Sequence, residues 1–249
     1  PIHNTPPFCV CLQRARWKIL FQTQPSAQIL VSQSVDDEMS LEKTTKPLTE
    51  IIEYLCHRDG KFRFIADEVN LPSSRNLSDG FTLLVETIIS QQLYNKAAET
   101  IFERFLEKHN LSFGFQPVDL VATQETIREC GVSNAKAKFI LSIRDELISN
   151  SNFFHDLSVL SDEEVERQLV RLKGVGVWTA RILMISLYGR LDVFPYNDGT
   201  LVTAIRLMGY KSKSVEEISS VWAPYRSVAA RLLWNAYDKG LLTDNKDHK

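Results

Sequence analysis

Gly174 and Gly176 form the part of the sequence best suited to binding an anion. They separate two stretches with helical spacing of apolar residues, and the second stretch begins at Val177. Amide groups at the start of a helix lack partners within it and lie at the positive end of the helix dipole. The spacing Leu172-x-Gly174-x-Gly176 therefore predicts a corner between two helices that can hold a phosphate. The alternative is an ordinary turn that only connects the helices.

An aspartate follows the second glycine at a distance of 22 residues. Asp198 stands before Gly199, where either Asn197 or Asp198 would make a good N-cap for the next helix. The local sequence alone favours this cap. A carboxylate can also stabilise a developing cation or activate a water molecule, and a cap would hold it in place for that task. Asp192 is a lesser candidate for the same chemistry.

The stretch from Arg171 to Met208 resembles the helix-hairpin-helix (HhH-GPD) superfamily of DNA glycosylases. It is most similar to the alkylpurine (3-methyladenine DNA glycosylase II-like) branch, in which Gly-x-Gly-x-Trp-Thr-Ala precedes an Asp-Val-Phe-Pro…Asp segment. The corresponding residues here read GVGVWTA over 174–180 and DVFPYND over 192–198. Three further segments match the family: 81–92, 120–141 and 222–227, the last with Tyr225 in place of the usual tryptophan.

The resemblance implies a monofunctional DNA glycosylase that hydrolyses the N-glycosidic bond of a flipped-out alkylated purine and leaves an abasic site. It makes Asp198 the catalytic carboxylate. It also places Trp178 and Tyr225 in the base pocket, where electron-rich rings attract a cationic base. Relatives that also nick the strand carry a lysine at the position of Trp178, so the sequence predicts no lyase activity. The alternative for both rings is a place in the core.

The resemblance also implies a DNA-binding surface around Gly174, Gly176 and Thr179. Gln92 or Leu93 occupies the place of the wedge that fills the space left by the flipped base, with Gln92 preferred. The alternative is that both residues only end a helix. Family resemblance further suggests a monovalent cation bound by hairpin carbonyls, namely those of Val170, Leu172 and Val175. No other cofactor is expected, and no cysteine cluster follows the third helix, where relatives carry an iron–sulfur site.

Charge and composition are compatible with this interpretation. The 249 residues carry a net charge of −2, which by itself says nothing for nucleic acid. Between residues 167 and 231, however, ten Lys/Arg accompany four Asp/Glu, a local surplus that suits a phosphate backbone. No apolar run reaches membrane-spanning length, and four cysteines do not make a disulfide framework in a chain this long. With the family resemblance, we expect a monomer that acts on duplex DNA containing a damaged base and does not bind a membrane. It is expected in the cytoplasm or nucleoid of a prokaryote, or in the nucleus of a eukaryote.

The apolar periodicity predicts an all-α, two-lobed bundle with the hairpin at the cleft between the lobes. One glycosylase domain is expected over 46–249, preceded by an arm of uncertain structure over 1–45. This arm has no acidic residue before Asp36, as in a transit peptide, although residues 29–31 could equally form a short strand. Helices are expected at 48–56, 62–69, 81–91, 96–108, 118–122, 125–130, 135–147, 161–172, 177–189, 201–208, 215–222 and 227–237. Ser161 and Glu164 are expected to form a capping box at the start of the 161–172 helix.

Two other functions fit the same motifs. One is a glycosylase of the same family with a different specificity, such as a mismatched, oxidised or deaminated base. The other is a DNA-binding module that keeps the hairpin but has no catalytic activity. Asp198 and Trp178 distinguish the second possibility, because a binding module needs neither residue.

Overall fold

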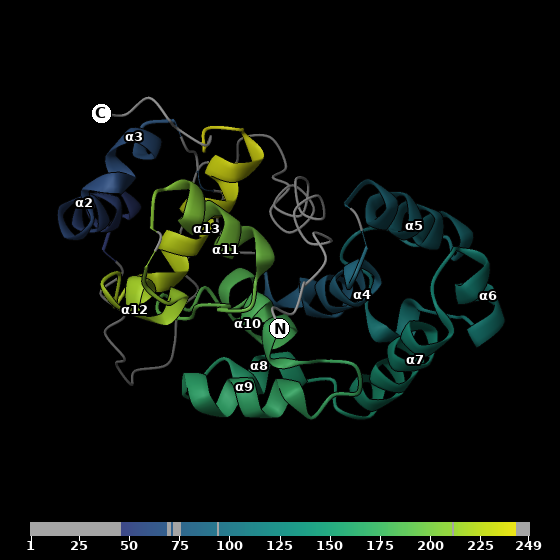
Figure 1. Cartoon of the computed structure of the whole chain (residues 1–249). Coiled ribbons are helices and arrows are strands. Elements are labelled where there is room, and N and C mark those ends of the chain that lie inside the picture. The colour runs from purple at the N-terminus through teal and green to yellow at the C-terminus, as the bar shows by residue number, and fades with distance from the viewer. Residues whose placement is uncertain (1–45, 69–70, 72–75, 94, 211, 243–249) are drawn as a thin grey trace, which may run out of the picture.

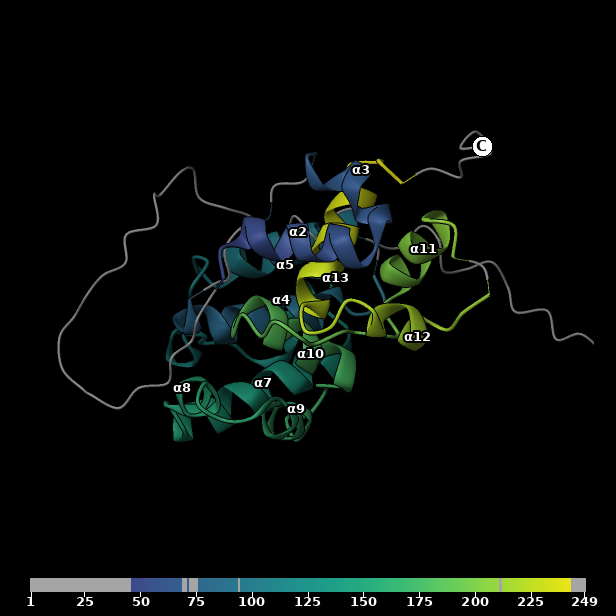
Figure 2. The same ribbon diagram turned by 90° about the vertical axis from the view of Figure 1, so that its left-hand side faces the viewer.

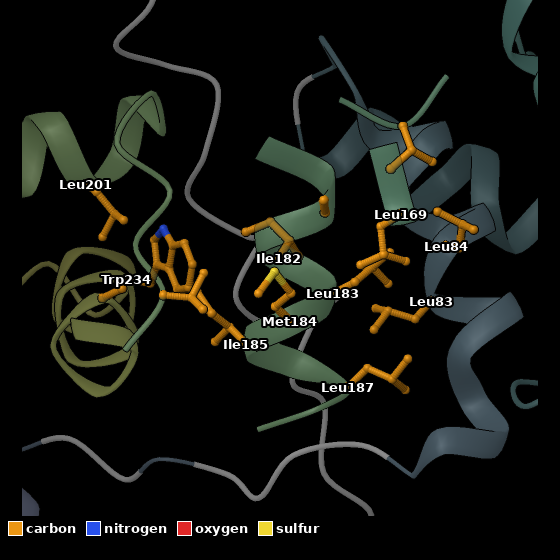
Figure 3. Close-up of a cluster of buried hydrophobic side chains, with 14 of the residues drawn as sticks. Leu83, Leu84, Leu169, Ile182, Leu183, Met184, Ile185, Leu187, Leu201 and Trp234 are labelled. Carbon is orange, nitrogen blue, oxygen red and sulfur yellow. The ribbon is translucent and has the colours of Figure 1, made fainter. Parts of the chain in front are cut away.

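Helix α10 (Val177–Ser186) lies at the centre of the computed structural model, which describes residues 46–68, 71, 76–93, 95–210 and 212–242. Most of its residues are buried, as expected for a helix that is apolar on all sides. Helices α4 (Gly80–Ser90) and α9 (Asp162–Val170) pack against it. Figure 3 shows Leu201 and Trp234 on the other side of α10. The second helix of the predicted hairpin is therefore also the central element of the fold.

The remaining helices form two groups around α10 (Figure 1), one to its right and below it and the other to its left. One group contains α4, α9, α5 (Asn95–Lys108), α6 (Gln124–Glu129), α7 (Asn134–Ser149) and α8 (Phe153–Leu157). The other group contains helices from both ends of the described chain, namely α2 (Leu48–Arg58), α3 (Arg63–Ala66), α11 (Gly199–Leu207), α12 (Val215–Ser220) and α13 (Arg226–Asp238). Short 3-10 helices occur at Gly60–Phe62, Leu77–Asp79 and Pro117–Asp119.

A second view separates the α2, α3 and α13 group from α7, α8 and α9 (Figure 2). Helices are the only regular elements in the described part of the chain. The all-α, two-lobed fold predicted from the apolar periodicity is thus confirmed.

Side-chain caps define several helix starts. The Ser161 hydroxyl accepts a hydrogen bond from the Glu164 amide, as predicted, and thereby caps α9. The Glu164 side chain does not complete a reciprocal capping box, because its carboxylate accepts instead from Gln168 one turn later. Ser133 caps α7 in the same way as Ser161 caps α9.

One expected helix does not form, one helix was not expected, and one expectation lies outside the described residues. The helix expected at 118–122 is wrong, since only a 3-10 turn forms at Pro117–Asp119, where the Asp119 carboxylate accepts from the Gln116 amide. Helix α8 was not predicted, because five residues are too short to display a period. The arm expected over 1–45 lies outside the described residues. Among the described helices, none combines the length and the apolar character needed to cross a membrane.

Candidate active site

The corner between α9 and α10 contains two glycines in different environments. Gly174 has φ of +84°, and a Cβ atom at this position would lie 2.4 Å from the ring of Phe139. This glycine is therefore required by the fold itself. Gly176, the N-cap of α10, has φ of −92° and no atom within 4 Å of a Cβ position. Nothing inside the described structure requires glycine at this position, so the open space in front of α10 is available to an approaching group.

The first turn of α10 has the properties of an anion site. Its N-cap residue, Gly176, provides no side chain to cap the amides of the first turn. The Val175 amide donates to the Leu172 carbonyl at 3.1 Å, which closes the corner. The Leu172 carbonyl thus uses one of its two lone pairs and keeps one for a cation. Carbonyl oxygens are suitable ligands for an alkali ion, so the expected set of Val170, Leu172 and Val175 fits such a group chemically.

Arg181 connects the hairpin with the loop that carries Asp198. Its guanidinium donates to the Glu166 carboxylate of α9 at 2.6 Å and to the Phe194 carbonyl at 3.1 Å. The same guanidinium lies 5.2 Å from the centre of the Tyr196 ring. Both helices of the hairpin and the acidic loop are therefore held by one half-buried side chain.

The loop is also attached to the start of α13. The Arg226 guanidinium forms a two-pronged salt bridge with Asp192, with N–O distances of 2.7 and 2.8 Å. This carboxylate raises the pKa of Arg226. The Ser227 hydroxyl accepts from the Val193 amide and donates to the Val193 carbonyl, both at 2.9 Å. Asp192, the lesser catalytic candidate, is therefore engaged in anchoring the loop.

Asp198 is buried, with 2% of its surface exposed, and it caps α11. Its Oδ1 accepts hydrogen bonds from the Leu201 amide at 3.0 Å and from the Trp234 indole at 3.1 Å. Its Oδ2 accepts from the Trp178 indole at 2.9 Å. A carboxylate has about four lone-pair positions, so three donors leave one position on Oδ2. The predicted cap is therefore confirmed, whereas the catalytic role of Asp198 stays a prediction.

The two predicted base-pocket aromatics occupy different surroundings. Trp178 is half-buried and contacts Asp198 through its indole nitrogen. Tyr225 makes an edge-to-face contact with Tyr54, with ring centres 5.2 Å apart, in the turn before α13. The structure brings Trp178 and Asp198 together, and the role of either ring at a base stays a prediction.

The turn after α4 has unusual backbone geometry. Gln91 has φ of −52° and ψ of 131°, and Gln92 has φ of +55°. The Leu93 amide donates to the Ser90 carbonyl at 3.2 Å. These features define a type II turn, in which the position of Gln92 normally favours glycine. Gln92 is exposed while Leu93 is half-buried, so Gln92 is the better placed of the two proposed wedge residues.

Thr179 has an internal contact rather than an outward one. It is 2% exposed, and its hydroxyl accepts from the Gln91 side chain at 3.2 Å. The side chain therefore faces the interior, and the role of Thr179 in DNA binding stays a prediction. The hydroxyl instead connects α10 to the turn that carries Gln92.

Sequence reasoning missed three residues around the site: Trp234, Gln91 and Arg181. Trp234 lies on a buried helix 36 residues after Asp198, where nothing in the periodicity separates it from the core. Gln91 precedes the residue that the family motif singles out. Arg181 carried a weak signal, as a charge on an otherwise apolar helix.

The geometry defines a class of protein. A helix-hairpin-helix corner with open amides is joined rigidly to a loop that presents a buried carboxylate. This combination is typical of proteins that bind a nucleic-acid backbone and act on an adjacent nucleotide.

Comparison with known proteins identifies the family. A family profile described as "HhH-GPD superfamily base excision DNA repair protein" matches residues 85–224, more than half of the chain. The chain therefore belongs to this family, as the motifs predicted.

Two relatives from Schizosaccharomyces pombe illustrate the similarity. The chain is 31% identical over 159 residues to "Alkylbase DNA glycosidase-like protein mag2", covering 61% of this chain and 75% of the relative. It is 32% identical over 158 residues to "DNA-3-methyladenine glycosylase 1", covering 61% of this chain and 69% of the relative.

A solved structure is similar over a larger part of the chain. The Schizosaccharomyces pombe 3-methyladenine DNA glycosylase Mag1, in complex with abasic DNA, has a TM-score of 0.67 and 28% sequence identity. The match covers 80% of this chain and all of that one. The similarity thus includes helices outside the segment matched by the family profile.

Proposed function

We propose that this protein is a monofunctional DNA glycosylase that removes alkylated purines of the 3-methyladenine and 7-methylguanine type from duplex DNA. The proposal rests above all on Asp198, a buried carboxylate held by neutral donors beside the hairpin. It is supported by the names of the relatives, which describe alkylbase and 3-methyladenine glycosylases. The protein acts as a monomer, in the nucleus of a eukaryote or on the nucleoid of a prokaryote.

Binding begins at the backbone of the DNA. The open amides at Gly176 donate hydrogen bonds to a phosphate. The hairpin carbonyls of Val170, Leu172 and Val175 would hold a monovalent cation that adds positive charge beside this phosphate. The target nucleotide then leaves the stack, since its glycosidic bond is shielded in the duplex. Gln92 fills the space left in the duplex.

Asp198 carries out the chemical step. The glycosidic bond breaks with its electron pair moving to the purine, which leaves as a neutral molecule because alkylation had made it cationic. The free lone pair on Asp198 Oδ2 faces the cationic sugar and orients the attacking water. The water oxygen bonds to C1′ of the sugar, and the carboxylate receives the released proton.

Trp178 contributes to base recognition and limits the reaction to hydrolysis. Its ring attracts the cationic base through a cation–π contact of about 0.5–2 kcal/mol. Position 178 has no amine that could attack the sugar, so no Schiff base forms and the strand stays intact.

The test is incubation of the protein with duplex DNA carrying methylated purines, with the released bases identified by chromatography. We expect release of the free alkylated base, an abasic product and an uncut strand. The Asp198→Asn variant should lose at least about 100-fold in rate while still binding abasic DNA. If the wild-type protein binds abasic DNA but releases no base, the protein is a non-catalytic DNA-binding module. Release of a mismatched or oxidised base instead would change the assigned specificity.

A further inference from the structure

The side chain of Gln91 crosses from the turn after α4 to the hairpin. Its Nε2 donates to the Gly174 carbonyl at 3.0 Å and to the Thr179 hydroxyl at 3.2 Å. A carbonyl can only accept, so the amide nitrogen must face the hairpin, and both of its N–H groups are used. One acceptor belongs to the glycine corner and the other to the first turn of α10. The amide therefore connects the turn to both parts of the anion site.

The main chain of the same residue is held from the opposite side. The ammonium group of Lys136, on α7, donates to the Gln91 carbonyl at 2.6 Å and to the Ile89 carbonyl at 2.9 Å. These carbonyls lie at the C-terminal end of α4, where helix carbonyls lack partners and the dipole is negative. Lys136 thus stabilises the end of the helix from which the turn projects.

This double attachment involves the residue that directly precedes the strained Gln92. The left-handed backbone of Gln92 is unfavourable for a residue with a side chain, so it persists only when neighbouring contacts impose it. Gln91 supplies such contacts through both its side chain and its carbonyl. Without them, the turn could relax and the Gln92 side chain would change direction.

We propose that Gln91 is a positioning residue which, with Lys136, sets the wedge turn (Ser90–Leu93) at a fixed place relative to the phosphate-binding hairpin. This inference rests on the proposed function. The hairpin fixes where the DNA backbone lies, and the wedge must enter the duplex at the step from which the base has left. Gln91 connects these two elements directly, so the wedge enters the duplex at a fixed distance from the phosphate that the hairpin binds.

Comparison of duplex with single-stranded substrate tests this role. A single strand has no stack to fill, so loss of wedge position should matter only for the duplex. The Gln91→Leu variant should release alkylated purine from duplex DNA about tenfold more slowly, since it loses two hydrogen bonds that hold the turn. Its rate on single-stranded DNA should stay within about twofold of the wild type. Gln91→Glu, which has the same size but cannot donate to a carbonyl, should show the same duplex-specific loss.

Thr82→Val is the matched control. Thr82 lies near the other end of α4, is fully buried and donates to the Phe115 carbonyl at 2.9 Å. Its loss should lower the melting temperature without changing the ratio of duplex to single-strand rates. An equal loss on both substrates for Gln91→Leu would mean that Gln91 is merely structural, and no loss on either would also overturn the proposal.

A double-mutant cycle with Gln92 tests whether Gln91 affects base release through the wedge residue. If Gln91 acts through the wedge, adding Gln91→Leu to Gln92→Ala should slow base release from duplex DNA by less than about twofold. Fully additive losses would overturn the proposal.

Lys136→Met should lower the duplex rate but leave the salt dependence of DNA binding unchanged. Loss of a phosphate contact would instead reduce, by about one, the slope of the logarithm of the binding constant against the logarithm of the salt concentration. That outcome would remove Lys136 from the proposal.

A fluorescence measurement separates this inference from the glycosylase assignment. A duplex with 2-aminopurine opposite an abasic site reports insertion of the wedge without any bond cleavage, and the Asp198→Asn protein can be used. Wild-type and Asp198→Asn proteins should change the fluorescence upon binding, and Gln91→Leu should reduce the change without abolishing binding. If no base is released but this pattern holds, the glycosylase assignment fails and the positioning role stands. If Gln91→Leu gives the full change, the positioning role fails by itself.

Discussion

Replacing Gln92 with glycine should make the fold more stable and the protein less active on duplex DNA. Gln92 has φ of +55° in a turn position that favours glycine. The left-handed backbone costs a residue with a side chain about 1–2 kcal/mol, whereas glycine loses about 0.5–1 kcal/mol more chain entropy on folding. The net gain is about 0.5–1 kcal/mol in the free energy of unfolding, the difference between these two estimates.

This gain is measurable as a shift in the melting temperature. For a domain of this size, 1 kcal/mol corresponds to about 2–4 °C, so thermal unfolding of Gln92→Gly should occur about 1–4 °C higher than for the wild type. Base release from duplex DNA should fall at least about tenfold, because no side chain remains to fill the gap. Single-turnover release of base, measured on the same preparations, tests the second half of the prediction.

Asn110 provides the matched control. It is the other described residue with a side chain and positive φ, at +52°, and it lies exposed beyond the end of α5. Asn110→Gly should be slightly stabilising, with a smaller gain because asparagine tolerates this backbone region, and should not change base release. A lower unfolding temperature for Gln92→Gly, or base release from duplex DNA at the wild-type rate, would refute this prediction.

Three further predictions concern the hairpin and the carboxylate. Gly174→Ala should lower the free energy of unfolding by at least about 1–2 kcal/mol, because φ is positive and the Phe139 ring is too close for a Cβ atom. Gly176→Ala should lower it by only about 0.5 kcal/mol but should weaken DNA binding. Urea unfolding measures the first effect, and titration with DNA measures the second. Asp198→Asn should destabilise the fold by about 1–3 kcal/mol, because an amide N–H would face the Trp178 indole N–H. Adding Trp178→Phe should restore much of the lost melting temperature without restoring base release. A double variant as unstable as Asp198→Asn would contradict this prediction. Trp178→Lys should not yield a borohydride-trapped complex with DNA, since a lysine there also needs a lowered pKa to attack the sugar; a trapped complex would show that the neighbouring groups provide it.

The sequence predicted the elements of this fold better than their connections. Periodicity and caps located α9 and α10 because each signal is local, and the Ser161 cap formed as expected. The 118–122 segment contains apolar residues without a helix: Leu120 reaches the core from an irregular loop, whereas Val118 and Val121 are exposed. Nothing local distinguishes such a loop from a helix.

The site was predictable only where motif and chemistry coincide. Asp198 and Trp178 were recognised from their spacing, and the structure joins them through one hydrogen bond. Trp234 contacts the same carboxylate from α13, but no local pattern relates it to Asp198. The bonds of Gln91 span more than 80 residues of sequence, and a single sequence carries no record of such pairings.

The two aspartates of the acidic loop illustrate how the same side chain is used in two ways. Asp192 meets the guanidinium of Arg226, so its charge is neutralised and it serves to anchor the loop. Asp198 is more deeply buried but is held by two indoles and an amide, which fix its position and add no positive charge. A carboxylate that must stabilise a cationic sugar has to be rigid and still carry its negative charge when the substrate arrives. An arginine partner would supply the rigidity and remove the charge, whereas neutral N–H donors supply the rigidity alone. The difference in partners therefore supports the proposal that Asp198, and not Asp192, performs the chemistry.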